Sequence, residues 1–249
     1  MILPMNLDPT LTVLMYSSLA AMTAVIGVLP QAVRGAPSPH AIGWANALAA
    51  GLMMGVAYTL LTAGLADRLA QGGVGAVLGI LFVRGTHAAT GTGELDLTRL
   101  HEAGPVYGYK VLLADTLHAA HEGIAIGAAM SLSLPLGISM AVALAVHNVP
   151  EAMVLGRVLL GQGTGVGQAA GLAVATNINQ VLLAVVTFAV ITAAPAMLPW
   201  VIGFTVGALL YLVLVELLPE AYRQAGHTSI ALVTVVAMGM VVLLSGLGL

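Results

Sequence analysis

The stretch from Leu198 to Leu218 reads LPWVIGFTVGALLYLVLVELL and contains one charged residue, Glu216. A helix that crosses a membrane needs about 20 consecutive apolar residues, because the hydrocarbon core of a bilayer is about 30 Å thick. The rest of the chain has the same character, because 59% of its 249 residues are hydrophobic and only 7% are charged. Soluble domains carry roughly 25% charged residues. The predicted fold class is therefore an all-α integral membrane protein.

Breaks at proline, glycine and charged residues divide the chain into a predicted bundle of eight transmembrane helices. The predicted spans are about 11–33, 41–65, 73–83 (extending as far as 89), 110–132, 134–160, 169–193, 198–218 and 229 to the end. Residues 1–249 are thus expected to form a single transmembrane domain. The polar segment at about 84–109 is predicted to be a mobile loop, with His87, His101 and Glu102 among its polar residues.

The basic residues predict the orientation of the chain, because lysine and arginine collect in cytoplasmic loops. With eight spans, one side of the membrane receives Arg34, Arg84, Arg99, Lys110, Arg157 and Arg223, and only Arg68 falls on the other side. Both termini are therefore predicted to lie outside, with the 84–109 loop in the cytoplasm. A multi-pass protein of the plasma membrane is expected. The basic residues never cluster, so no nucleic-acid partner is expected.

Ionisable side chains within membrane spans are costly and usually functional, and here they concentrate in two spans. The fourth span contains His118 and Glu122, and the fifth contains His147 and Glu151. A spacing of four residues places each pair on one helix face. Two such faces packed together would offer two imidazoles and two carboxylates to one metal ion, a ligand set that suits zinc. The alternative is a pair of ordinary polar contacts between helices.

Two further residues of the fourth span have open roles. Asp115 lies on the face of Glu122, where it is either a relay group beside the metal or an interfacial carboxylate. His121 is either a fifth ligand or gate, or a histidine that forms a supporting hydrogen bond. Glu216 is a further intramembrane carboxylate whose role the sequence leaves open.

These motifs resemble those of the Zrt/Irt-like (ZIP) metal transporters. The fourth-span segment His118-Ala-Ala-His-Glu122-Gly123 is similar to the family motif His-Asn-x-Pro-Glu-Gly, and His147-Asn148-Val-Pro150-Glu151 is similar to its fifth-span counterpart. The segment from Gly207 to Ala221 also looks like the family's seventh span. The resemblance implies import of divalent metal toward the cytoplasm along the centre of a helical bundle.

The departures from the family pattern concern the position where family members often hold a second metal. Ala119 replaces the asparagine of the fourth-span motif, Asn148 stands where an acidic residue can occur, and Gln180 stands where a glutamate is expected. We therefore predict one main metal site, with Asn148 and Gln180 as weak or neutral ligands beside His118, Glu122, His147 and Glu151.

The predicted function is transport of divalent transition metals, with zinc expected first and Fe²⁺, Mn²⁺, Co²⁺ and Cd²⁺ as other candidates. The metal is cargo, so no prosthetic group is expected, and the protein is not expected to be an enzyme. Two alternatives stay open: an intramembrane zinc-dependent hydrolase, whose open coordination position would activate water, and a membrane metal sensor. The expected partners are the metal ions and the lipid bilayer. The abundant small residues also allow a homodimer.

Overall fold

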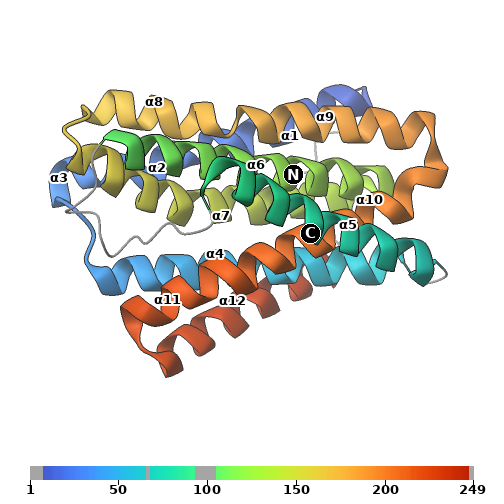
Figure 1. Cartoon of the computed structure of the whole chain (residues 1–249). Coiled ribbons are helices and arrows are strands. Elements are labelled where there is room, and N and C mark those ends of the chain that lie inside the picture. Colours follow the sequence, from blue (N-terminus) through green and yellow to red (C-terminus); the bar gives the residue numbers. More distant parts are fainter. Residues whose placement is uncertain (1–7, 66–67, 93–104, 247–249) are drawn as a thin grey trace.

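The computed structural model describes residues 8–65, 68–92 and 105–246, and the regular structure within these ranges is helical (Figure 1). The helices are α1 (Pro9–Met22), α2 (Ala24–Val28), α3 (Gln31–Arg34), α4 (Pro39–Gly64), α5 (Leu69–Thr90), α6 (Pro105–Leu132), α7 (Leu134–Gly161), α8 (Val166–Thr176), α9 (Ile178–Ala193), α10 (Leu198–Leu212), α11 (Leu218–Ala225) and α12 (His227–Gly246). A short 3₁₀ helix (Pro195–Met197) precedes α10, and a π-helical turn (Val213–Leu217) joins α10 to α11.

Seven continuous helical runs of the described residues are long and apolar enough to cross a membrane, which confirms an all-helical membrane protein. The runs are Pro9–Arg34, Pro39–Gly64, Leu69–Thr90, Leu134–Gly161, Val166–Ala193, Pro195–Ala225 and His227–Gly246. Helix α6 is as long as α7 but carries more ionisable residues. The count of eight spans and the outside position of both termini stay predictions.

The predicted loop at 84–109 is wrong at both of its ends. Helix α5 continues through Thr90 and closes at Gly91, which adopts a left-handed conformation and donates its N–H to the carbonyl of His87. Helix α6 already begins at Pro105. Local polarity suggested a loop, but His87 is buried against other helices, and this tertiary contact stabilises the last turns of α5. His101 and Glu102 lie outside the described residues.

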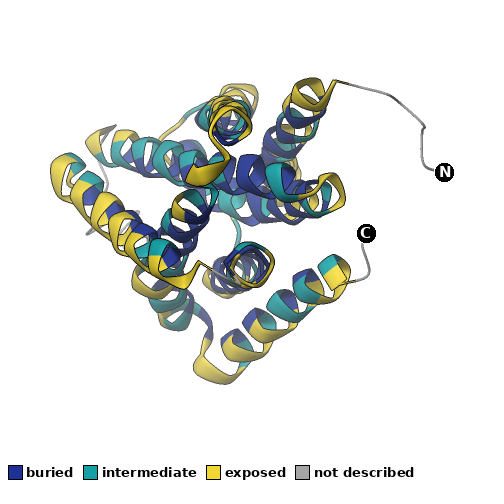
Figure 2. Ribbon diagram, turned by 90° about the vertical axis from the view of Figure 1, so that its right-hand side faces the viewer, coloured by how far each residue is buried: buried dark blue, intermediate teal, exposed yellow. Residues whose placement is uncertain are grey.

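Helices α6 and α7 form an antiparallel hairpin in the interior of the bundle. Helix α9 packs along α6, whereas α1, α2 and α4 pack against α7. Helix α5 packs mainly against α10, and α12 packs against α4. Figure 2 shows the buried faces turned toward one another and the exposed faces turned outward. The exposed faces carry large apolar side chains such as Leu78, Val235 and Leu243, as expected of a surface that contacts lipid.

Glycines allow α5 and α10 to approach until their backbones touch. An added Cβ at Gly79 of α5 would clash with the carbonyl of Phe204, and one at Gly207 of α10 would clash with the carbonyl of Ala76. Small residues at such crossings drive helix association in membranes, because they let the backbones come close. This glycine seam between α5 and α10 brings α5, which carries His87, beside α10, which leads to Glu216.

A methyl group at Gly207 is expected to destabilise the protein. The helices would have to separate, and overpacking of this kind costs roughly 1–3 kcal/mol. Gly207→Ala should lower the midpoint of thermal unfolding in detergent by several degrees. Gly239→Ala on α12 is the control, because an added Cβ there meets no atom within 4 Å. Equal midpoints for the two variants would contradict the close packing of α5 on α10.

Candidate metal centre

The first cluster of ligands, here called the His147 triad, consists of Glu122 from α6 and of His147 and Glu151 from α7. The Nε2 atom of His147 lies 2.8 Å from Oε1 of Glu122 and 3.7 Å from Oε2 of Glu151. The other ring nitrogen, Nδ1, lies 3.3 Å from the carbonyl oxygen of Ala49. A carbonyl only accepts hydrogen bonds, so Nδ1 carries the proton in this contact. The lone pair of Nε2 is then directed at the carboxylates, the arrangement that a metal-binding histidine needs.

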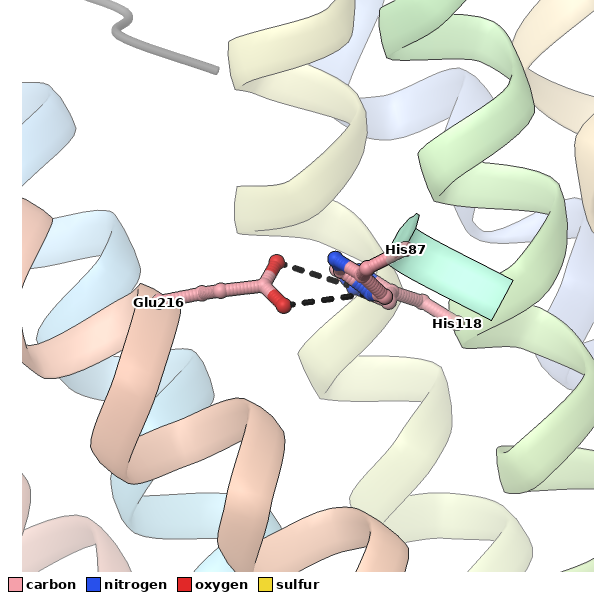
Figure 3. Close-up of side chains that lie close together, drawn as sticks. All are labelled: His87, His118 and Glu216. Carbon is pink, nitrogen blue, oxygen red and sulfur yellow. Dashed lines mark ion pairs between the residues drawn. The ribbon is translucent and has the colours of Figure 1, made fainter. Parts of the chain in front are cut away.

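The second cluster, here called the His87 triad, consists of His87 from α5, His118 from α6 and Glu216 from the π-helical turn. Oε1 of Glu216 lies 3.2 Å from Nε2 of His87, and Oε2 lies 3.3 Å from Nε2 of His118. Figure 3 shows the two imidazole rings meeting the two oxygens of one carboxylate. The rings are roughly parallel, with 6.2 Å between their centroids.

Glu151 connects the two triads. Its Oε2 faces His147, while its Oε1 lies 3.5 Å from Nδ1 of His118. His118 in turn contacts Glu216 through its other nitrogen. Alternating imidazoles and carboxylates therefore extend from Glu122 to His87, so neighbouring metal positions would share ligands.

The two triads border one cavity of about 280 Å³. His118, His147, Glu151 and Glu216 line it, together with Asn46, Asp115, Glu220 and Arg223. The carboxylate of Asp115 accepts a hydrogen bond of 2.7 Å from the hydroxyl of Thr176, which places Asp115 inside the bundle. The carboxylate of Glu220 is held by Arg223 and Gln224.

Several acceptor atoms of this centre have no hydrogen-bond partner among the described residues. Oε2 of Glu122 is in this position, although Glu122 is fully buried. Oε1 of Glu122, Nε2 of His118 and Oε1 of Glu216 are buried with only the ion-pair contacts at 2.8, 3.3 and 3.2 Å given above. Buried polar atoms are rarely left unpaired. A cation between such acceptors would complete their coordination, and the nitrogen and oxygen donors suit zinc and the neighbouring transition metals.

The four residues predicted to share one metal lie close together, but they do not surround a single point. Glu122, His147 and Glu151 form one triad, whereas His118 belongs to the other and meets them through Glu151. That all four residues ligate one ion stays a prediction, and His118 is near enough to Glu151 to share a ligand with the other three. The spacing of four residues correctly placed each histidine and carboxylate pair on one helix face. It could not reveal that His118 also contacts Glu216, which comes from a different helical segment.

Asn148 and Gln180 belong to neither triad. Both are fully buried, and Nδ2 of Asn148 donates to Oε1 of Gln180 over 3.0 Å and to the carbonyl of Ala20 over 2.9 Å. This amide pair links α7 to α9 and to α1. Their role as weak or neutral ligands stays a prediction.

The predicted position of His87 in a loop is wrong, because this ligand candidate lies in α5. The sequence showed Glu216 only as an isolated carboxylate within an apolar stretch. The signal that could have paired them is a single histidine in one largely apolar span and a single carboxylate in another. His121 belongs to neither triad, and its roles as a fifth ligand, a gate or a hydrogen-bonding residue stay predictions. It is buried beside Phe82 and Phe204, and neither ring nitrogen has a hydrogen-bond partner among the described residues.

A family model described as ZIP Zinc transporter matches residues 84–245, which include both triads. The chain belongs to the ZIP zinc transporter family. Among the relatives of this ZIP protein is a putative zinc transporter of Arabidopsis thaliana, 28% identical over 84% of this chain and 34% of the relative. Zinc transporter GufA of Myxococcus xanthus is 31% identical over 45% of this chain and 44% of the relative.

Zinc transporter ZIP10 of Mus musculus is 34% identical over 47% of this ZIP protein, a segment that amounts to 14% of the relative. The chain thus covers less than half of the length of each of these three relatives.

Proposed function

We propose that this ZIP-family protein transports divalent transition metal ions, zinc first, across the membrane toward the cytoplasm. The observation that carries the proposal is the row of two ligand triads joined by Glu151 inside a membrane bundle. Membership of the ZIP family and the printed names of the relatives support zinc as cargo. Fe²⁺, Mn²⁺, Co²⁺ and Cd²⁺ share enough coordination chemistry with zinc to be tested beside it.

Transfer of the ion from one triad to the next is the proposed chemical step. In the His147 triad one imidazole and two carboxylates would replace three water molecules of a hydrated ion, and a water could complete a tetrahedral shell. Glu151 would then exchange its partner. It would release His147 and bind the ion with His118, while Glu216 and His87 supply the remaining ligands. Shared ligands keep each step small, so no stage needs a fully dehydrated ion.

The direction of transport rests on the placement of basic residues. Arg34 ends α3, and Arg157 and Arg223 lie in the last two turns of α7 and α11, at the left-hand end of the bundle in Figure 1. Arg68 precedes α5 at the opposite end. The positive-inside rule places the first end in the cytoplasm. The His87 triad lies about one helical turn nearer to this end. Helix α7 ends here and α6, antiparallel to it, begins here, so His118 lies one turn nearer to this end than Glu122. For the same reason Glu151, which contacts His118, lies one turn nearer to it than His147.

Uptake by liposomes that contain the purified protein tests the proposal. Zinc, iron, manganese, cobalt and cadmium would be presented one at a time, with protein-free liposomes as the control. Uptake of at least one metal above the control supports transport, and the ranking of rates identifies the preferred cargo. If the protein bound a metal tightly but moved none, transport would be wrong and a membrane sensor would be the better proposal. The hydrolase alternative has no specific structural observation in its favour.

Metal binding should weaken as the pH falls from 8 to 5. An imidazole or carboxylate must be deprotonated to bind a metal, so protons compete with the ion and binding releases protons. A lower pH therefore raises the dissociation constant. Calorimetric titration with zinc in two buffers of different ionisation enthalpy would measure the number of protons released. A dissociation constant that stayed flat across this range would show that none of the three histidines is a ligand.

One tightly held metal ion per chain is expected in the wild-type protein, with the other triad filled only when metal is supplied in excess. Glu151 is the carboxylate that connects the two triads, and the buried amides Asn148 and Gln180 supply no charge that could stabilise a second ion. Elemental analysis after dialysis should give about one zinc per chain. The double variant Asn148→Asp/Gln180→Glu should bind an additional ion, and the two single variants are its controls. Two tightly held ions in the wild type would contradict this expectation.

A further inference from the structure

The turn that carries Glu216 is wider than a regular α-helix. Helix α10 ends at Leu212, the π-helical turn covers Val213–Leu217, and α11 starts at Leu218. The N–H of Leu218 donates to the carbonyl of Val213, five residues earlier, instead of to a residue four positions back. Such turns contain one extra residue within an otherwise continuous helix, and they are frequent at functional sites.

Pro219 explains why the turn widens at this point. Proline has no N–H, so Pro219 cannot bond to the carbonyl of Val215, and in a regular α-helix its ring would collide with that carbonyl. A π turn directly before the proline moves this carbonyl away, one of the recognised ways in which a helix adapts to such a residue.

The helices on either side of the turn are fixed independently. Helix α10 is held by its glycine seam with α5, where Gly207 contacts the backbone of Ala76. Helix α11 is held by α4, where Ala221 and Ala225 lie against Gly43. The extra residue lets both packings coexist. Each residue of an α-helix turns the chain by about 100°, as follows from 3.6 residues per turn. One residue more or less in the turn therefore decides the direction in which Glu216 points.

In the wide turn Glu216 points at the histidines. Its two oxygens lie 3.2 Å from Nε2 of His87 and 3.3 Å from Nε2 of His118, and Figure 3 shows both contacts. The neighbouring side chain of Leu214 is 60% exposed and that of Val215 is 51% exposed, so these residues contribute little to the core. The turn thus presents one carboxylate to the cavity, next to two largely exposed apolar side chains.

We propose that Pro219 and the π turn before it are the positioning element of the His87 triad. They direct Glu216 toward His87 and His118 and so set the metal affinity of that triad, without contributing a ligand of their own. The inference rests on the proposed role of the triads in metal binding. Pro219 is a positioning residue, since its effect on the metal passes through Glu216.

Deletion of Leu214 tests this directly. Removing one residue leaves too few residues for the π turn while α10 and α11 keep their own packing, so Glu216 can no longer meet both histidines. The matched control is Leu214→Ala, which removes the same side chain and keeps the residue count. Co²⁺ is the probe, because its visible absorption reports the number and type of its ligands. The deletion should weaken Co²⁺ binding at the His87 triad by about 10-fold or more, as lost supporting groups do at metal sites, and Leu214→Ala should not.

Glu216→Gln supplies the comparison that separates positioning from general damage. The deletion should reproduce the Co²⁺ spectrum of Glu216→Gln, and combining the two changes should cause no further loss, as expected of changes that remove the same contact. The spectrum that reports the His147 triad should persist in all three proteins, which also shows that they fold. Pro219→Ala should give a partial loss of the same spectral feature.

The proposal is overturned if the deletion variant keeps the wild-type spectrum and affinity, or if Glu216→Gln weakens binding further in the deletion background. It is also overturned if the signal of the His147 triad is lost as well, because the turn would then support the whole bundle. These readouts concern binding alone. If wild-type liposomes took up no metal while the spectra behaved as described, the transport proposal would fail and the positioning role would stand.

Discussion

Replacing His147 by alanine is expected to weaken zinc binding by at least about 100-fold and to abolish uptake into liposomes. His147 supplies the single imidazole of its triad, and its Nε2 lies 2.8 Å from Glu122. Loss of groups that merely support a ligand already costs 10–100-fold in metal affinity, and loss of the ligand itself should cost more. Without His147, Glu122 and Glu151 would also face each other as buried carboxylates with no imidazole between them.

His121→Leu is the matched control for His147→Ala. It removes a buried imidazole from the same region, but that ring contacts Phe82 and Phe204 and belongs to neither triad. Leucine fills a similar volume in this apolar environment, so binding and uptake should stay close to those of the wild type. Calorimetric titration and zinc uptake would measure both variants. If His121→Leu lost as much binding as His147→Ala, the assignment of the ligands would be wrong.

Glu151→Gln is expected to stop transport more completely than any other single carboxylate change. Glu151 is the one carboxylate of the described centre that contacts both His147, through Oε2, and His118, through Oε1. A glutamine keeps the shape but loses the charge, and its amide NH₂ cannot bind a metal. Binding should weaken in both triads, and an ion that entered the His147 triad could not pass to His118.

Glu122→Gln separates this bridging role from a general loss of charge. Glu122 is equally buried within the bundle but belongs to the His147 triad alone. Its variant should lose the Co²⁺ signal of that triad and keep the signal of the His87 triad, whereas Glu151→Gln should change both. Indistinguishable spectra for the two variants would show that Glu151 does not connect the sites.

More of the fold than of the metal centre could be predicted from the sequence. Apolar stretches between proline, glycine and charged residues gave the helices to within a few residues, because hydropathy and helix breakers act locally. The spacing of His118 to Glu122 and of His147 to Glu151 gave the correct faces of α6 and α7 for the same reason. His87 was misplaced because its helix is stabilised by a partner, Glu216, that lies far away in the sequence.

The division of the ligands into two triads could not be predicted either. It depends on the direction of the Glu216 side chain, which the π turn before Pro219 determines. A proline near a helix start is common, and its sequence context did not distinguish a wide turn from a regular one. The amide pair of Asn148 and Gln180 was found by resemblance to the family pattern. Its hydrogen bond to Ala20 became visible only once α1, α7 and α9 were brought together.

That amide pair also bears on the state of the protein in which no metal ion is bound. Two carboxylates buried at these positions would repel each other whenever no cation lay between them, and the metal-free protein would lose stability. Asn148 and Gln180 carry no charge, and their hydrogen bonds join three helices whether or not an ion is present. This contact between α1, α7 and α9 therefore does not depend on a bound cation.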